Sequence, residues 1–569
     1  MFFVPEKIEA FGLKLLVLGI LSMYGLPLCM AQELPWEQAS TKSDYSLLYC
    51  PLVKLSLSCG NQRCEKLLGE KASNCPQDCS SYLLQNWNEA VQCEKAQELF
   101  HPETEIAVQT IVREAQKLRQ KLRVVGGAFS NTSIICSDDI MIATDRLNKV
   151  IGLELYDGEE TVLVQAGARL DQLMEWLAER DLALEGYPAP ILRPATIGGV
   201  LATSSHSSST RHKASMSDIV ASVDIVNWQG EIKTYAPQIS SSLEWRAATA
   251  NLGLLGVMTK IRLKVRPEVT LHMRAEVRAE EELFAAGDPI DIIDDCDYGQ
   301  MWWNPVAKKF LWICGQESDQ QPDLSADNNL TETTYQVLRT LSSGIAKPLA
   351  SVFELAACSR FFRCKMRDLI TPHSLVDAKI FSYEKNGKKV RTDEVYGRSF
   401  RMITSDFDGF HEIRTRFLEL VVPASQRKSA LEAIRDYYRS SKFCELFSVY
   451  NLRFVPVTEQ SLISNTAPGE GFIPGDVAMF IEINGYYPKG MEQKHFAEFD
   501  AYNAGLVKIL MDDFGARPHW GKGEGWFHSY AEQLGRWHQG KKQFKEVLRQ
   551  ADPHGMFQND FTIRAGLGL

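Results

Sequence analysis

Two segments of the chain combine glycines with hydroxyl side chains, a composition suited to holding a phosphate group. The first, Gly126 to Thr132, follows the strand-like run Leu122 to Val125. Its glycines allow backbone amides to turn inward and face an anion. The second, Pro194 to Ser209, has two adjacent glycines followed by a run of serines. Two glycines after a strand are more often an ordinary turn, so the first segment alone does not establish a phosphate site.

A dinucleotide-binding fold of the Rossmann type would also place glycines after a strand. That fold requires the spacing G-x-G-x-x-G and a helix whose N-terminus takes the pyrophosphate. Neither feature follows Gly127, and Thr132 to Asp139 shows no helical periodicity. The sequence therefore predicts a different way of binding phosphate.

A third segment carries groups that could act on a substrate. If Val449 to Val455 is a strand, its two-residue period puts Asn451 and Arg453 on the same face. The apolar flanks favour a buried cleft for Arg453, and an exposed salt bridge is the alternative. The Asn451 amide can hold a substrate hydroxyl by hydrogen bonds, whereas it cannot act as a charged acceptor.

The elements around these segments predict a mixed helix-and-strand fold. Apolar residues recur at helical spacing near 108–118, 170–178 and 243–250, and strand patterns cover 122–125, 161–166 and 257–265. Residues 219–227 and 231–235 predict a hairpin around Gln229-Gly230. We expect a loop through the second glycine segment and a surface loop from Glu317 to Thr334.

Composition limits the classes of function. The 569 residues are 45% hydrophobic and 24% charged, as in a folded protein of two or three domains. The net charge of -10 argues against a protein that follows nucleic-acid phosphates, because such binding needs a basic surface. A small neutral or weakly charged substrate fits better.

The N-terminus has the pattern of an export signal. Leu15 to Leu28 is almost continuously apolar, follows Lys14 and leads into Cys29-Met30-Ala31. We expect a signal peptide over residues 1–31 and a protein that is secreted or enters the secretory lumen. A membrane anchor is the rival interpretation, but it needs about 20 apolar residues, and this shorter stretch contains Pro27.

Cysteine use agrees with an oxidising compartment. Six of the thirteen cysteines lie between Cys50 and Cys93, which predicts a disulfide-rich region over residues 32–85. Zinc is the competing interpretation, yet the spacings are not paired C-x-x-C units and no histidine lies among them. Asn329-Leu330-Thr331 predicts a glycosylation site, whereas we expect Asn131 of a second sequon to be buried.

The order of the motifs resembles that of the aldonolactone oxidases. Val124-Val125-Gly126-Gly127 comes first, Ile197-Gly198-Gly199 with His206 follows, and then Leu252-Gly253-Leu254-Leu255-Gly256. The tail adds Arg517-Pro518-His519-Trp520-Gly521-Lys522. The resemblance covers roughly residues 86–569. This family includes gulonolactone, galactonolactone and arabinonolactone oxidising enzymes and belongs to the vanillyl-alcohol-oxidase class of flavoproteins.

The resemblance implies an α+β fold with two domains. Residues 86–267 would form a PCMH-type FAD-binding domain, and residues 268–569 a cap and C-terminal domain. Tyr298 to Pro305 would be the opening strand of the cap. Taken without the family, Trp302 and Trp303 in that run are residues of a core or a cleft wall.

The cofactor implied by the resemblance is FAD. Relatives bond the flavin covalently to a histidine where Phe129 stands, and phenylalanine has no nucleophilic nitrogen, so we expect non-covalent binding. His206 would be a second tether, a contact on the pyrophosphate side, or a hydrogen-bonded histidine of a polar loop. The cofactor-binding residues implied are Val125, Gly126, Gly127, Ala128, Phe129, Ser130, Asn131, Thr196, Gly198, Gly199, Ser205, His206, Gly256 and Val257.

The reaction implied is oxidation of the CH–OH group of a sugar lactone or related polyol, with hydride transfer to the flavin N5. The protein must position the C–H bond, accept the hydroxyl proton and supply a cation for the flavin. Relatives carry Glu-x-Arg where this chain has Asn451 and Arg453, so the cation is retained and the carboxylate is lost. His519 and Lys522 match residues that line the site, and either would take the proton. A surface charge is the alternative for Lys522.

The electron acceptor stays open between molecular oxygen and another oxidant. Relatives that differ in oxygen reactivity differ at a small residue on a strand resembling Met141 to Ile151, where this chain has Asp145. A catalytically inactive, secreted flavin-fold binding protein is the second hypothesis, which Phe129 and Asn451 favour. Arg453 and His519 favour an enzyme. We expect no bound metal, no nucleic-acid partner and no stable membrane span.

Overall fold

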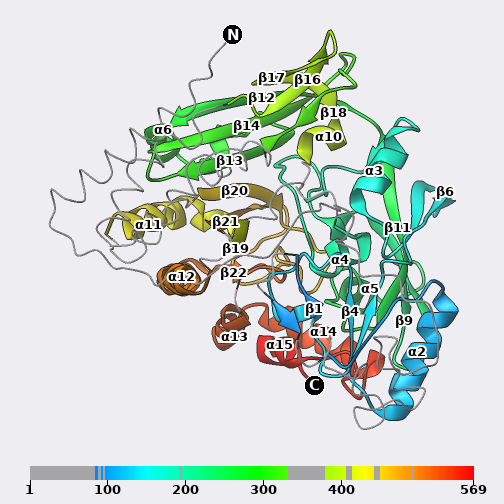
Figure 1. Cartoon of the computed structure of the whole chain (residues 1–569). Coiled ribbons are helices and arrows are strands. Elements are labelled where there is room, and N and C mark those ends of the chain that lie inside the picture. The colour runs from blue at the N-terminus through cyan, green and yellow to red at the C-terminus, as the bar shows by residue number, and fades with distance from the viewer. Residues whose placement is uncertain are drawn as a thin grey trace, which may run out of the picture.

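The computed structural model describes most of the chain after the N-terminal region. It covers residues 84–87, 91–93, 96–190, 195–330, 378–404, 413–440, 449–488, 492–523 and 525–569. The predicted signal peptide and nearly all of the cysteine-rich region lie outside these ranges. Within them, no helix has both the length and the apolar character needed to cross a membrane. Figure 1 shows a broad sheet that includes β12, β13, β14, β20 and β21 beside a second half that carries α2 to α5.

The second half begins with a small parallel sheet in the order β3-β5-β4. Between β3 and β4 runs α2, which Thr104 caps by accepting the amide of Ala107, and which buries Val108, Val112 and Ala115. The strand predicted before the first glycine segment is therefore confirmed as β4. The bounds are β1 Leu84–Gln85, β2 Gln92–Cys93, β3 Glu98–Phe100, α2 Glu105–Leu118, β4 Leu122–Val125, η2 Ser133–Ile135 and β5 Ile140–Ala143.

A larger antiparallel sheet follows in the order β10-β9-β11-β7-β6, and β8 also pairs with β11. The predicted hairpin is confirmed by the pairing of β9 with β10. The predicted helix over 170–178 is α3, because Leu170, Leu173 and Leu177 point into the core. The bounds are β6 Val150–Tyr156, β7 Glu159–Gln165, α3 Leu170–Ala178, β8 Leu182–Leu184, α4 Ile197–Ala202, η3 Met216–Asp218, β9 Val220–Val226, β10 Ile232–Tyr235, α5 Ser242–Ala248 and β11 Val257–Pro267.

Two expectations about this half were wrong. The second glycine segment is not a loop throughout, since it contains α4, a short helix that buries Ile197, Val200 and Leu201. The strand expected over 141–151 is two strands, β5 and β6, with a turn between them that holds Asp145. Local periodicity was too short in both places to separate a helix turn from a loop, or one strand from two.

The cap is an eight-stranded antiparallel sheet in the order β18-β12-β14-β13-β20-β21-β19-β22. Its first strand along the chain is β12, so the expectation that Tyr298 to Pro305 opens the cap was wrong. The alternation in β12 of exposed or half-buried charged residues with buried apolar ones carried that information. The bounds are β12 Thr270–Ala279, β13 Tyr298–Asn304, β14 Lys309–Ser318, β18 Glu394–Arg398, β19 Ile413–Val422, β20 Val449–Pro456, β21 Val477–Pro488 and β22 Arg517–Pro518.

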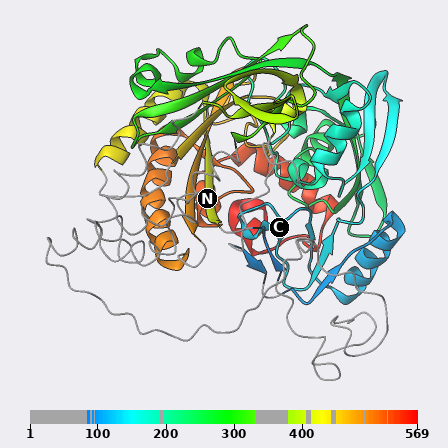
Figure 2. The same cartoon turned by 45° about the horizontal axis from the view of Figure 1, so that its top comes forward.

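Helices and a small sheet cover the cap. In both views α11 and α12 lie together beside β19 and β21 (Figure 1 and Figure 2). A three-stranded sheet in the order β15-β16-β17 stands near β18. The bounds are α6 Glu280–Ala285, η4 Pro289–Ile292, β15 Asp327–Asn328, β16 Phe381–Lys385, β17 Lys388–Thr392, α10 Ser399–Ile403, η8 Ala424–Gln426, α11 Arg427–Ser440 and α12 Glu492–Phe514.

The predicted glycosylation site does not fit its surroundings. Asn329 is buried, its amide donates to Ser382 Oγ at 2.7 Å, and its oxygen accepts from Lys389 Nζ at 2.7 Å. A glycan cannot be attached to this nitrogen without breaking the packing. Asn131, in the other sequon, is buried as expected. Of the run expected as a surface loop, the residues up to Ser318 belong to β14.

The last segment of the chain returns to the half that carries α2 to α5 and ties the two halves together. Arg123 Nη1 donates to Phe557 O at 2.6 Å, and Asn131 N donates to Gly521 O at 2.7 Å. In Figure 1 the red C-terminal helices accordingly lie beside the blue strands. The bounds are α13 Gly525–Gln533, α14 His538–Ala551, α15 Asp560–Thr562 and η9 Ile563–Leu567.

Two disulfides lie among the described residues. One joins Cys93 of β2 to Cys136, directly after η2, and so fixes the segment that follows the first glycine loop. The other joins Cys296, two residues before β13, to Cys314 within β14. Bonds of this kind persist in oxidising compartments, and the compartment of this protein stays a prediction.

Candidate active site

A continuous cavity runs from the two glycine segments to the cap sheet. Its walls come from three parts of the chain: the FAD-binding half, the cap strands, and the tail after β22. The lining residues include Trp87, Gly126, Gly127, Ala128, Phe129, Ser130, Asn131, Thr196, Gly198, Gly199, Ser205, Gly256, Trp302, Phe417, Arg453, Glu482, Asn484, His519 and Lys522. The site is therefore complete only when both halves and the tail are in place.

At the glycine end the backbone is packed too closely for side chains. A Cβ added to Gly126 would lie 2.1 Å from Thr196 Oγ1, so the two glycine segments touch here. Gly256 has a φ of +133°, and a Cβ on it would lie 2.2 Å from Val226 O. Thr196 Oγ1 is buried without a hydrogen-bond partner among the described residues. Closely spaced amides and an unpaired hydroxyl fit the phosphates of FAD.

The first glycine loop also supplies an aromatic wall. Phe129 lines the cavity and lies against Trp87 at a ring distance of 6.1 Å. Trp87 in turn stacks on Phe417 of β19 at 5.8 Å. The Phe129 ring offers carbon atoms alone, so it can pack against the cofactor but cannot form the covalent bond that a histidine would.

Four cap strands bring one row of side chains to the cavity end. Register pairs Trp302 of β13 with Asn451 of β20, Asn451 with Glu482 of β21, and Glu482 with Glu419 of β19. Directly paired residues of antiparallel strands point to the same face of a sheet. Arg453 lies two residues along β20 from Asn451 and so shares this face, as the sequence predicts.

The row forms an ion network of two carboxylates and two cations. Arg453 Nη2 donates to Glu419 Oε1 in a short contact and lies 3.1 Å from Glu482 Oε2. Lys522 Nζ lies 3.1 Å from Glu419 Oε2 and contacts Glu482 Oε1. Burial alone would raise the pKa of Glu419, but the charges of Arg453 and Lys522 hold that pKa well below its ordinary value. Burial would lower the pKa of Arg453, yet Glu419 and Glu482 raise it.

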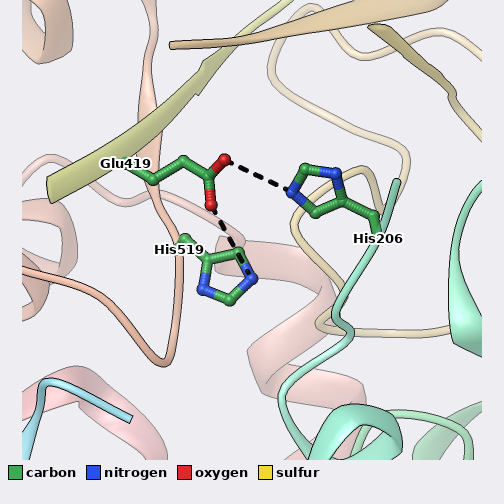
Figure 3. A group of neighbouring side chains, drawn as sticks. All are labelled: His206, Glu419 and His519. Atoms are coloured by element: carbon green, nitrogen blue, oxygen red, sulfur yellow. Dashed lines mark ion pairs between the residues drawn. The ribbon is translucent and has the colours of Figure 1, made fainter. Parts of the chain in front are cut away.

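Two histidines flank Glu419 on either side (Figure 3). His206 Nε2 lies 3.6 Å from Glu419 Oε1, and His519 Nε2 lies 4.0 Å from Glu419 Oε2. His519 Nδ1 accepts from Gly521 N at 3.1 Å, which places the proton of the neutral ring on Nε2, toward Glu419. Burial lowers the pKa of both imidazoles, and that of His519 falls well below its ordinary value.

These three residues also have the grouping of a metal site, since their ligand atoms all lie within 4.8 Å of one another. The surrounding charges argue for a different role. Arg453 and Lys522 already bind the Glu419 carboxylate, so a divalent cation there would sit against two positive side chains. We therefore interpret the group as part of the ion network.

The structure divides the expected site residues into those that line the cavity and those that do not. Eleven of the fourteen expected cofactor contacts line the cavity, together with Arg453, His519 and Lys522. Val125, His206, Val257 and Asn451 lie behind the wall. Asp145, the expected position governing oxygen reactivity, does not line the cavity and pairs with His101 at 2.8 Å.

Sequence reasoning missed the two carboxylates of the network. Glu419 and Glu482 each interrupt an apolar strand, Leu418–Val422 and Val477–Ile483. A charged residue inside a buried run is costly unless it is paired, so this interruption was the available signal.

The fold and the cavity together define an FAD-dependent oxidoreductase acting on CH–OH groups. An FAD binding domain family matches residues 96–236, and the D-arabinono-1,4-lactone oxidase family matches residues 261–565. The chain therefore belongs to the D-arabinono-1,4-lactone oxidase family.

Individual relatives agree with this assignment. The chain is 25% identical over 487 residues to the L-gulono-1,4-lactone dehydrogenase of Mycobacterium tuberculosis, covering 85% of this chain and 99% of that protein. It is 29% identical to the D-arabinono-1,4-lactone oxidase of Eremothecium gossypii, covering 48% and 51% of the two chains. The crystal structure of cholesterol oxidase from B. sterolicum superposes with a TM-score of 0.64 at 16% identity, covering 85% and 96%. That likeness concerns the fold.

Proposed function

We propose that this protein oxidises the CH–OH group of a sugar lactone, of the gulono-1,4-lactone type, or of a related polyol. The observation that carries the proposal is the set of polar groups at the cap end of the cavity. Trp302 Nε1 and Asn484 Oδ1 are buried there without a partner among the described residues. With Glu482 and Lys522 they offer two donors and two acceptors, which suits a small ligand that carries several hydroxyls.

The relatives support the same class of substrate. The two named above act, by their names, on L-gulono-1,4-lactone and D-arabinono-1,4-lactone. These two lactones differ in length and stereochemistry, and they share a ring carbonyl beside a CH–OH group. We therefore propose the class of lactone rather than one member of it.

The residues of the cavity divide the work of such a reaction. The amides of the first glycine loop hold FAD, and FAD when bound supplies the hydride acceptor. Trp87, Phe129 and Phe417 exclude water from one side of the cavity. Arg453 supplies a fixed positive charge, and the polar row orients the hydroxyl that reacts.

The test is an absorption spectrum of the purified protein under anaerobic conditions. We expect the oxidised flavin band to bleach when gulono-, galactono- or arabinono-1,4-lactone is added. Bleaching by an alditol alone would narrow the proposal to a polyol. A flavin that stays oxidised with every lactone and polyol would overturn it and favour a catalytically inactive binding protein.

The electron acceptor is decided by the same sample. After the flavin has been bleached, air is admitted, and in a parallel cuvette a quinone or dye acceptor is added. Return of the band in air at a rate that supports turnover indicates an oxidase. Return with the dye alone indicates a dehydrogenase.

We further propose that the protein is exported. The apolar run before Ala31 and the disulfides Cys93–Cys136 and Cys296–Cys314 support this, since such bonds persist in oxidising compartments. Edman sequencing of the mature protein should begin at Gln32. Protein in the cytosol that still begins at Met1 would contradict the proposal.

A further inference from the structure

Glu482 is the carboxylate of the network that faces the cavity. It lines the cavity wall, whereas the Glu419 carboxylate is fully buried behind it and is enclosed by Arg453, Lys522 and the two histidines. Both carboxylates bind the same two cations, so they differ in whether they face the cavity. Of the described acidic side chains that line this cavity, Glu482 is the one that a ligand can touch.

The neighbours of Glu482 hold its two oxygens separately. Lys522 contacts Oε1, while Arg453 Nη2 at 3.1 Å and Asn451 Nδ2 at 3.4 Å approach Oε2. Three donors on two oxygens fix the plane of the carboxylate. Each oxygen of an ionised carboxylate has two lone pairs, so acceptor capacity is left for a further hydrogen bond.

Asn451 gains a defined role from this arrangement. It is paired directly with Glu482 across β20 and β21, and it lies behind the cavity wall. Its amide therefore acts on the substrate through Glu482. We describe it as a positioning residue.

The other candidates for proton acceptor are already occupied. The neutral His519 ring carries its proton on Nε2, and its Nδ1 accepts from the backbone of Gly521. Lys522 donates to both carboxylates, so its ammonium acts as a donor. Of the described side chains at the cavity end, Glu482 is the remaining one that can accept a proton, since Asn484 offers a neutral amide oxygen.

We propose that Glu482 is the catalytic residue that accepts the hydrogen bond of the reacting hydroxyl and then its proton, with Asn451 as its positioning residue. The inference rests on the proposed oxidation of a CH–OH group. FAD when bound would accept the electron pair of the breaking C–H bond as hydride, the C–O bond would become a carbonyl, and the O–H proton would pass to a Glu482 oxygen. As the hydride leaves, the hydroxyl becomes the O–H of a protonated carbonyl, a strong acid that gives its proton to the carboxylate.

The first experiment compares Glu482→Gln with wild type in anaerobic stopped-flow, using whichever lactone or polyol bleaches the wild-type flavin. We expect the rate of bleaching to fall at least a hundredfold, with FAD content retained. The matched control is Glu280→Gln. Glu280 is a buried carboxylate of the same cap that binds Trp303 and Arg439 away from the cavity. That variant should keep the wild-type rate, and a similar loss in both variants would overturn the assignment.

The second experiment moves the carboxylate across the strand pair. Glu482→Asn should be as slow as Glu482→Gln, and adding Asn451→Glu to it should recover at least tenfold in rate. If Glu482 has a purely structural role, flavin bleaching in the double variant should be slower than in either single variant. No recovery, with both proteins folded and loaded with FAD, would overturn the proposal.

Separate measurements test the oxidation of a lactone or polyol and the role of Glu482. If no lactone or polyol bleaches the wild-type flavin, the proposed function fails. Titration of the flavin absorption with gulono-1,4-lactone then decides the inference, because Glu482→Gln should weaken binding at least tenfold relative to Glu280→Gln. Equal affinities, or no binding by wild type, would overturn it.

Discussion

Arg453 is the residue on which both carboxylates of the site depend. It is buried, and it donates to Glu419 and Glu482 from one guanidinium nitrogen. We expect Arg453→Met to slow anaerobic flavin bleaching about a hundredfold, since removing one preorganised charge costs on the order of 3 kcal/mol. It should also destabilise the fold by about 3–5 kcal/mol, because a buried anion loses its partner. Stopped-flow and urea unfolding measure the two effects.

Arg453→Lys is the matched variant for this prediction. It keeps the charge and loses the planar, branched donor group, so stability should recover more than rate. A wild-type bleaching rate in Arg453→Met would contradict the position given to this strand.

The side chain of Phe129 predicts that FAD is bound without a covalent bond at this position. The ring lines the cavity where a histidine would carry the covalent bond, and His206 lies behind the wall with its Nδ1 donating to Ser207 O at 2.9 Å. We therefore expect acid precipitation to release yellow FAD into the supernatant. Flavin that stays in the pellet, on a peptide containing His206, would show a second covalent tether instead.

The site residues could be predicted from sequence only in part. Asn451 and Arg453 share one strand, so the two-residue period was enough to put them on one face. Glu482 and Glu419 belong to other strands, and their place beside Asn451 depends on the register of three strands that sequence patterns do not fix. The missing carboxylate was therefore predicted as a loss, although the neighbouring strand supplies one.

At the scale of elements, the contact between the two glycine segments is the feature most sensitive to change. A methyl group at Gly126 would have to lie where Thr196 Oγ1 is, at 2.1 Å. We expect Gly126→Ala to push the segments apart and to weaken FAD binding at least tenfold. The affinity for FAD is measured by diluting the loaded protein and following the release of FAD by its fluorescence.

The control for this variant is Gly287→Ala. Its Cβ would meet its nearest neighbour, Asp291 Oδ2, at an ordinary 3.4 Å, far from the cavity. Unchanged FAD release in Gly126→Ala would mean that the segments can separate without affecting the cofactor.

Elements with long, regular patterns were predicted well, and short or interrupted ones were not. The α3 helix presents five buried residues on one face over nine positions, so its period was clear. The α4 helix has six residues, two of them glycines. Hydrogen bonds from Ile197 N to Ala168 O and from Gly198 N to Ala166 O hold it in place, rather than its own propensity. Tertiary contacts of that kind leave no local trace in a sequence.

At the scale of the whole molecule, buried neutral histidines make stability depend on pH. Burial lowers the pKa of His528 to about 3 and also lowers those of His206 and His519. Below the unfolded-state pKa of about 6.5, these histidines bind protons in the unfolded chain but stay neutral in the folded protein. The free energy of unfolding therefore falls as pH falls. His528 should cost about 2 kcal/mol between pH 6.5 and pH 5, and the lowered pKa values of His206 and His519 change stability in the same direction.

Urea unfolding at pH 7, 6 and 5 measures this slope, and His528→Phe should remove about one histidine's share of it. Glu419 acts in a lower window. Its pKa is depressed in the folded protein, so its contribution is present above about pH 4.3 and is lost as pH falls below that value. A stability that stays flat between pH 7 and pH 5 would contradict the protonation states given to the histidines.

The return of the C-terminal segment to β4 has a consequence for how the protein is made. Phe557, which accepts the hydrogen bond of Arg123, lies 434 residues further along the chain. During synthesis every strand up to β11 therefore emerges before Phe557 has been added to the chain. Until then, this edge of the cofactor pocket lacks the partner that covers it. A nascent chain that stops before this segment is expected to leave the ribosome without FAD.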